Sequence, residues 1–149
     1  MDLLSYDFYK NREDLFEAAF SIISSSSTEE LSLQLEKLWE NHRGELVQAV
    51  DWNRYPLVLY QTICTCFGGE RLANLLRIVA QNYKASRSGM PDLLLWKLQF
   101  DENGSPMHDI LFSEVKGPRD RLSAKQILWI HRMLQSDIPV EVLHVKETK

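Results

Sequence analysis

The sequence predicts an α+β fold, because helical and strand patterns occupy different parts of the chain. Apolar residues recur at helical spacing through most of the first 84 residues. Two strand-like runs follow, with an Asn-Gly pair between them, and this pair is a strong hairpin signal. A helical pattern and a last apolar run then end the chain. The length of 149 residues is sufficient for one domain with its own core.

The first third of the chain is predicted to be an acidic helical scaffold, residues 1–55. Residues 1–51 hold four Lys or Arg and eleven Asp or Glu, whereas the rest of the chain has a net positive charge. The motif Ser27-Thr-Glu-Glu30 has the pattern of a capping box and starts the second of two helices. The residues predicted to face inward from these two helices are Leu15, Phe16, Ala19, Phe20, Ile23, Leu31, Leu35, Leu38 and Trp39.

Residues 56–149 are predicted to form the main core. Pro56 suits the first turn of a helix that runs to about Phe67, and Gly68-Gly69 separates it from a helix over residues 70–84. Cys64 and Cys66 lie in the first of these helices, and we interpret them as buried, reduced thiols. Ser123 is predicted to cap a helix over residues 122–134, and residues 138–145 to form the last strand.

Polar residues within the two apolar strands point to a functional site. Asp92 precedes Leu93–Trp96, and Glu114 and Lys116 interrupt the second strand. Side chains alternate along a strand, so Glu114 and Lys116 point to one face and Val115 to the other. A hairpin would bring Asp92 close to both.

Two carboxylates and an ammonium at one end of a sheet suit a divalent metal with a cationic helper. Mg²⁺ and Mn²⁺ prefer oxygen ligands, which Asp92, Glu114 and the carbonyl of Val115 could supply. Lys116 could position the attacking water or offset charge in the transition state. The short pattern alone leaves a second interpretation open, namely a Lys–Glu pair at a strand end and an aspartate that begins a strand.

Two longer motifs carry a resemblance to a known family. They are Arg87-Ser-Gly-Met-Pro-Asp-Leu-Leu-Leu-Trp96 and Ser113-Glu-Val-Lys-Gly-Pro-Arg-Asp-Arg-Leu-Ser-Ala-Lys-Gln-Ile-Leu-Trp129. They closely resemble the VRR-NUC domain of the PD-(D/E)xK nuclease superfamily and, within it, the Fanconi-associated nucleases. The resemblance implies a restriction-endonuclease-like core with a mixed sheet flanked by helices. It also implies that Asp92 and Glu114 are metal ligands and that Lys116 is the catalytic lysine.

The resemblance further implies a function. Members of this group are structure-selective DNases with 5′-flap endonuclease and 5′–3′ exonuclease activity, dependent on Mg²⁺ or Mn²⁺. They act in the nucleus in interstrand-crosslink repair, so the expected partners are branched or flapped DNA and DNA-repair factors. No apolar run of about 18 residues is present, and we therefore expect no membrane partner.

One feature of the family is missing from this sequence. The family places a further glutamate in a Glu-Gly-Ser/Thr setting upstream of the Pro-Asp motif, and no such setting occurs here. Glu70 follows two glycines, but its other neighbours do not match. We therefore expect a C-terminal piece of a larger nuclease, or a shortened form, whose partners include upstream domains of the same polypeptide. The alternative is a non-catalytic DNA-binding or scaffold remnant of the same fold.

Other residues around the motifs receive more specific expectations. Gln126 is at a helix position where the superfamily often has a polar residue facing the site, although a surface position is also open. Gly89 is expected to serve a backbone need. Trp96 and Trp129 are expected in the core rather than as base-stacking platforms. The residues that suit DNA phosphate contacts are Arg87, Arg119, Arg121 and Lys125.

Overall fold

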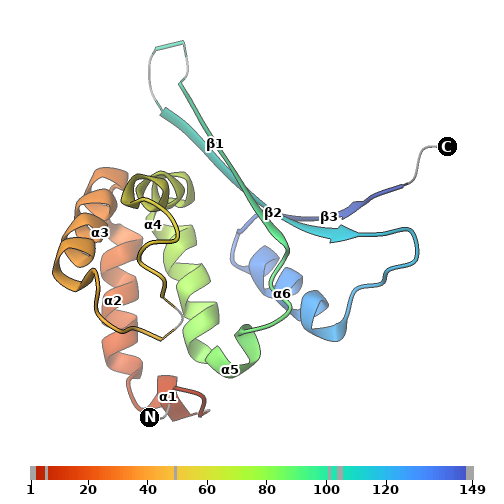
Figure 1. Ribbon diagram of the computed structural model, residues 1–149, viewed down its shortest axis with the longest axis horizontal. Coiled ribbons are helices and arrows are strands. Elements are labelled where there is room, and N and C mark those ends of the chain that lie inside the picture. Colours follow the sequence, from red (N-terminus) through yellow and green to blue (C-terminus); the bar gives the residue numbers. More distant parts are fainter. Residues whose placement is uncertain (1–2, 6, 49, 101, 104–105, 147–149) are drawn as a thin grey trace.

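Most of the helices form one side of the molecule, and a β-hairpin projects from its middle beyond them (Figure 1). The computed structural model describes residues 3–5, 7–48, 50–100, 102–103 and 106–146. The elements, in chain order, are α1 (Asp7–Lys10), α2 (Glu13–Ser25), α3 (Thr28–His42), α4 (Leu57–Gln81), α5 (Tyr83–Ser86), β1 (Leu93–Phe100), β2 (Pro106–Lys116), α6 (Ala124–Gln135) and β3 (Val140–His144). The predicted order of helices, two strands, a helix and a strand is confirmed.

Helices α2 and α3 both pack against α4. The predicted capping box starts α3, since the Ser27 side chain accepts from Glu30 N and the Glu30 side chain accepts from Ser27 N. Phe20 and Leu31 are buried as expected. Leu15 and Leu38 are 73% and 55% exposed and Ala19 is also exposed, so the predicted inward positions of these three residues were wrong. A helix covered mainly by one neighbour buries only a narrow stripe, and residues beside that stripe stay in solvent.

Helix α4 is divided by its two glycines. Gly68 has φ 70° and ψ 165°, which breaks the helical path where the sequence predicts the end of one helix and the start of another. Gly69 serves a different need, because a Cβ there would lie 2.9 Å from the carbonyl oxygen of Ser24. The end of α2 therefore packs directly on the backbone of Gly69. These contacts cross the predicted boundary at residue 55, and the division into two segments stays a prediction.

The sheet has the strand order β1-β2-β3. Strands β1 and β2 are antiparallel, with Leu93 opposite Ser113, and β2 and β3 are parallel, with Phe112 opposite Val140. This is the mixed sheet that the sequence resemblance implies. Of the predicted turn between β1 and β2, Asp101, Gly104 and Ser105 lie outside the described residues.

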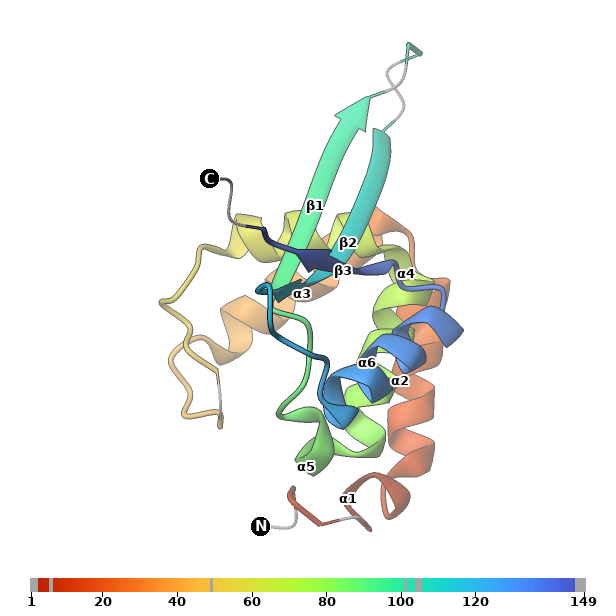
Figure 2. The ribbon, with the colours of Figure 1, turned by 90° about the vertical axis from the view of Figure 1, so that its right-hand side faces the viewer.

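The core lies on one face of this sheet, under α4 and α6. It contains Cys66, Phe67, Ile78, Ile110, Phe112, Trp129, Met133 and Ile138. Trp129 is buried as predicted, but Trp96 is 43% exposed, and its core assignment was wrong. Strand β1 is at the edge of the sheet and the hairpin extends beyond the helices (Figures 1 and 2), so Trp96 is covered from one side only.

Both cysteines are free, as predicted; Cys66 is buried, whereas Cys64 is only half-buried. Burial raises the pKa of the Cys64 and Cys66 thiols above the ordinary value for cysteine. No helix in the described ranges of the chain has the length and apolar character needed to cross a membrane.

Candidate active site

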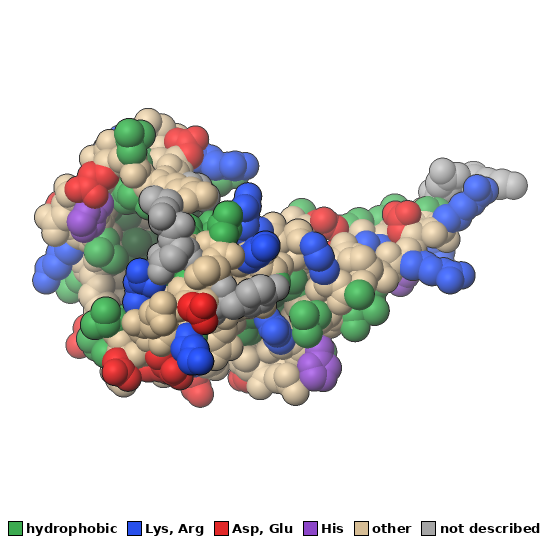
Figure 3. All heavy atoms as spheres, turned by 90° about the horizontal axis from the view of Figure 1, so that it is seen from below, with side chains coloured by type: hydrophobic (Ala, Val, Ile, Leu, Met, Phe, Trp, Pro, Cys, Tyr) green, Lys and Arg blue, Asp and Glu red, His purple; other side chains and the backbone are tan. Residues whose placement is uncertain are grey.

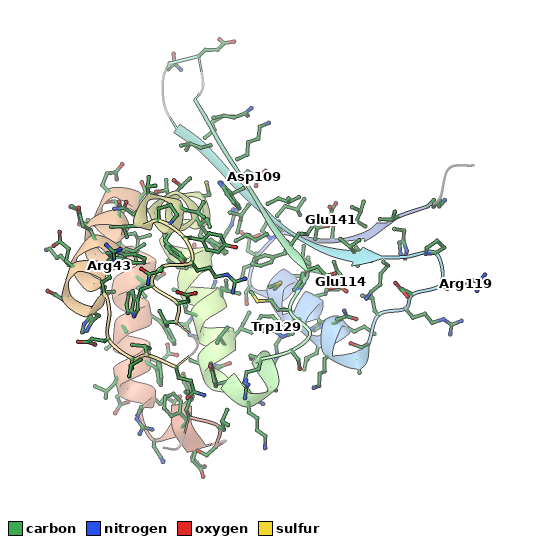
Figure 4. The ribbon with its side chains drawn as sticks, viewed as in Figure 1. Arg43, Asp109, Glu114, Arg119, Trp129 and Glu141 are labelled. Atoms are coloured by element: carbon green, nitrogen blue, oxygen red, sulfur yellow. The ribbon has the colours of Figure 1, made fainter. Side chains whose placement is uncertain are left out.

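The end of β2 carries a buried ion pair. Glu114 is 1% exposed and Lys116 is 8% exposed, and the Lys116 Nζ lies 2.7 Å from the Glu114 Oε1. The two side chains share a face because they are two residues apart on one strand. Figure 4 shows Glu114 on the side of the sheet that faces α6, opposite to Glu141. As predicted, Glu114 and Lys116 thus point to one face of the strand and Val115 points to the other.

Gln126 of α6 contacts both members of the ion pair. Its Nε2 donates to the Glu114 Oε1 at 2.5 Å, and its Oε1 accepts from the Lys116 Nζ at 3.2 Å. The same Oε1 also accepts from the backbone N–H of Ser123 at 2.9 Å, as part of the capping box that starts α6. These contacts fix the orientation of the amide, because its oxygen faces two donors and its NH₂ group faces a carboxylate. Helix α6 therefore begins in the site.

Asp92 is exposed and lies immediately before β1. Its Oδ2 accepts a hydrogen bond from the backbone N–H of Val115 at 3.0 Å, so its carboxylate is next to the Glu114–Lys116 segment. In a strand, the N–H and C=O of one residue point to the same edge. The Val115 carbonyl thus faces the edge where Asp92 lies, whereas the Lys116 carbonyl faces β3 and accepts from Val145 N at 2.9 Å.

The loop that leads to Asp92 is anchored on α6. The Trp129 Nε1 donates to the Ser88 carbonyl at 3.2 Å, and the Lys125 Nζ donates to the Ser88 Oγ at 3.0 Å. Gly89 has φ +86°, and a Cβ there would lie 2.8 Å from the Lys125 Cβ. The predicted backbone need for Gly89 is therefore confirmed. Sequence patterns gave no signal for Ser88, because its role depends on residues 37 and 41 positions away.

The four predicted DNA-contacting residues lie on the segments before β1 and after β2, and within the described part of the chain none of them bonds to Glu114, Lys116 or Gln126. Arg119 and Arg121 are exposed on the loop between β2 and α6, and Figure 4 shows Arg119 at the far end of that loop, away from Glu114. Asp120 holds the loop by accepting from Gly117 N at 3.0 Å. Arg87 is exposed after α5, and Lys125 bonds to Ser88 as described above.

The oxygen atoms at this site are of the kind that a hard cation prefers, but they are few. The Glu114 Oε2 is buried and has no hydrogen-bond partner among the described residues, although a buried carboxylate oxygen normally has one. Asp92 and the Val115 carbonyl add two further oxygens of the kind that Mg²⁺ and Mn²⁺ prefer. Within the described ranges, however, no cluster of three or more His, Cys, Asp and Glu residues is arranged to hold a metal. The set is therefore two carboxylates and one carbonyl.

Comparisons with known proteins agree with this geometry. A family model of the VRR-NUC domain matches residues 27–147. The Fanconi-associated nuclease 1 homolog of Oryza sativa subsp. japonica is 41% identical over 145 residues, which are 97% of this chain and 14% of the relative. Fanconi-associated nuclease 1 of Mus musculus is 34% identical over 146 residues, which are again 97% of this chain and 14% of the relative. The chain thus spans about a seventh of the length of these relatives.

A solved structure shows the same fold. The crystal structure of paFAN1 bound to DNA with a 2-nucleotide 5′ flap and a gap superposes with a TM-score of 0.74 and 26% sequence identity. The match covers 97% of this chain and 25% of that one. The predicted PD-(D/E)xK fold class is confirmed. Because the family model covers most of the chain and the relatives match nearly all of it, this chain belongs to the VRR-NUC domain family of nucleases.

Proposed function

We propose that this chain is the catalytic domain of a metal-dependent, structure-selective DNA nuclease with 5′-flap endonuclease and 5′–3′ exonuclease activity. The observation that carries the proposal is the buried network of Glu114, Lys116 and Gln126 beside Asp92, in which one Glu114 oxygen has no partner. A fully satisfied structural ion pair would not leave that oxygen free. A site prepared for a cation would do so.

Each residue of the network has a distinct role in this proposal. Asp92, Glu114 and the Val115 carbonyl would hold Mg²⁺ or Mn²⁺. The ion, when bound, supplies Lewis-acid chemistry that acidifies water and stabilises charge on a phosphate oxygen. Lys116, held by Glu114 and Gln126, offsets negative charge on the phosphate in the transition state. Gln126 positions both charged groups and so keeps the ammonium from moving when the phosphate arrives.

The proposed substrate is branched or flapped DNA. Arg87, Arg119, Arg121 and Lys125 would contact its phosphates, which fix orientation without reading sequence. The solved paFAN1 structures, which are bound to 5′-flap DNA, support this choice. We further propose that the protein acts in the nucleus, in interstrand-crosslink repair, with DNA-repair factors and with upstream domains of the same polypeptide as partners.

One observation favours a second candidate function. The described residues offer no third carboxylate at the site, and a hard cation held by few protein oxygens binds weakly. The chain could then be a non-catalytic DNA-binding or scaffold remnant. The two candidates differ in one property, which is whether the site completes a working nuclease when the rest of a family protein is supplied.

A chimaeric protein tests this difference. The matching segment of the Oryza sativa relative, which is named a nuclease homolog, is replaced by this chain, and the product is incubated with a labelled 5′-flap duplex and Mn²⁺. We expect cleavage. We expect Lys116→Met to reduce it by at least about 10²-fold in a chimaera that circular dichroism shows to be folded and that still binds DNA. We expect little or no cleavage by this chain alone.

The possible outcomes separate the candidates. A chimaera that binds the flap but does not cleave it would support the non-catalytic candidate. Robust cleavage by this chain alone, removed by Lys116→Met, would show that the chain already has a complete metal site. In that case the prediction that an upstream glutamate is missing would be wrong.

A further inference from the structure

A pocket on the helical side of the molecule is walled by aromatic rings and cations. It lies where α3 leads through a loop into α4, and its volume of about 580 Å³ is in the range of small-molecule sites. Its lining includes Trp39, Trp52 and Tyr55, together with Arg43 and Arg54, and no acidic residue. We call these five residues the aromatic cage. None of the residues of the candidate active site lines this pocket.

The rings of the aromatic cage are held in place by their neighbours. The ring centroids of Trp39 and Trp52 are 5.4 Å apart, with an angle of 79° between the ring planes. Tyr55 meets Tyr60 of α4 edge-on, with the centroids 6.2 Å apart. The Trp52 Nε1 also donates to the Glu45 carbonyl at 2.8 Å. These contacts fix the rings before a ligand arrives, so that binding does not have to order them.

The two arginines of the cage lie over its rings. The Arg43 guanidinium carbon is 5.8 Å from the Trp39 ring centroid, and that of Arg54 is 5.7 Å from the Tyr55 centroid. Aromatic cages often select quaternary ammonium ligands, but these two guanidinium groups would repel a cation. Guanidinium planes and aromatic rings both stack on flat π-systems, and a guanidinium also pairs with phosphate. The cage therefore suits a ligand that combines a flat ring with an anion.

The cage is a local group of cations in acidic surroundings. Residues 1–51 hold eleven Asp or Glu and four Lys or Arg, of which Arg43 is one. In the view from below (Figure 3), acidic side chains gather mostly on the helical side, and Lys and Arg side chains recur across the middle of the molecule. Duplex DNA carries one charge per about 1.7 Å of its axis, so such a surface disfavours it. A single nucleotide has one phosphate, and stacking of its base adds binding that does not depend on charge.

The proposed substrate contains nucleotides of this kind. In a duplex each base face is covered by its neighbours, whereas the unpaired bases of a flap are free to stack on aromatic side chains. The DNA in the solved paFAN1 structures has 5′ flaps of one and two nucleotides. Figure 4 shows Arg43 and Glu114 well apart, so a nucleotide in the cage would be distant from the phosphate that is cleaved.

We propose that the aromatic cage binds an unpaired nucleotide of the DNA substrate, with its base stacked on the rings and its phosphate paired with the two arginines. This inference rests on the proposed DNA substrate. It adds a site, separate from the candidate active site, that distinguishes flapped DNA from an unbranched duplex.

The experiment compares binding of the intact chain to two fluorescent duplexes, one with a 5′ flap of a few nucleotides and one without, by anisotropy. Stacking of one base on an aromatic side chain strengthens binding by about 5- to 150-fold, so the parent chain should prefer the flapped duplex by at least about 5-fold. Tyr55→Ala should remove most of this preference, and Tyr55→Phe should retain it because the ring is kept. Arg43→Gln should flatten the salt dependence of the preference by about 0.7 in the slope of log K against log salt.

Two matched controls lie near the cage but do not line its pocket. Leu46→Ala removes an exposed apolar side chain from the same loop, and Lys37→Gln removes an exposed cation from α3. Both should keep the preference of the parent chain. Circular dichroism confirms that each variant is folded. A second arm measures quenching of tryptophan fluorescence by oligothymidylate, by thymidine monophosphate and by a short acidic peptide that contains phenylalanine.

The outcomes separate the cage from the proposed substrate. If the parent chain binds both duplexes equally, or if Tyr55→Ala keeps the flap preference, the cage is refuted as a base site and the proposed DNA substrate stands. If the parent chain binds neither duplex nor oligothymidylate, both fall. Quenching by thymidine monophosphate without a flap preference would show that a free nucleotide is the ligand. Quenching by the acidic peptide but not by oligothymidylate would show a protein ligand, and either result would overturn the assignment to the flap.

Discussion

Replacing Gly89 by alanine tests whether the Asp92 loop is held in place by α6. Gly89 has φ +86°, a conformation that costs an L-residue about 1–2 kcal/mol. The new Cβ would also lie 2.8 Å from the Lys125 Cβ and 3.0 Å from the Lys125 carbonyl carbon. Because the second atom is backbone, the loop itself has to shift away from α6.

That shift weakens the two hydrogen bonds to Ser88, each worth about 1 kcal/mol. Together with the backbone cost, Gly89→Ala should destabilise the fold by about 2–4 kcal/mol. Gly44→Ala is the matched control, since Gly44 has φ +93° but a Cβ there meets nothing within 4 Å. It should show only the backbone cost of about 1–2 kcal/mol.

Urea denaturation followed by circular dichroism gives both values, and Mn²⁺ titration adds a functional readout. Gly89→Ala should destabilise the fold by about 1–2 kcal/mol more than Gly44→Ala does, or lower Tm by roughly 2–8 °C more for a chain of this size. Only Gly89→Ala should weaken Mn²⁺ binding, because only its loop carries Asp92. Equal destabilisation by the two changes, with unchanged Mn²⁺ affinity, would refute the idea that contact with α6 positions Asp92.

Two further predictions concern charged groups. Lys116→Met alone should destabilise the fold by about 3–5 kcal/mol, because it leaves the buried Glu114 without its cation. Combining it with Glu114→Gln should recover part of this loss. Urea denaturation in which the double variant is less stable than the single one would contradict this. Glu17 accepts a hydrogen bond from Arg77, which lowers the Glu17 pKa below its ordinary value of 4.5. The stability that this pair contributes is therefore fully present above pH 4.5 and is lost as the pH falls through the lowered pKa. Thermal melts should therefore depend less on pH below about 4.5 in Glu17→Gln than in the parent chain, and identical acid profiles would remove the role assigned to this pair.

Local signals in the sequence were sufficient for much of the fold. The Ser27 capping box, the break at Gly68 and the Asn-Gly hairpin each depend on residues a few positions apart, so the chain carries them without reference to its tertiary structure. The same is true of the alternation that puts Glu114 and Lys116 on one face of a strand. These signals placed the candidate residues on or beside two strands that pair in the structure.

Tertiary contacts decided the rest. The exposure of Trp96 follows from β1 being an edge strand, which no pattern within β1 reveals. The anchoring of Ser88 by Trp129, and the bond from Val115 N to Asp92, join residues 41 and 23 positions apart. Such contacts depend on how α6 and the hairpin pack, and the free energy of packing belongs to pairs of distant surfaces rather than to any single stretch of sequence.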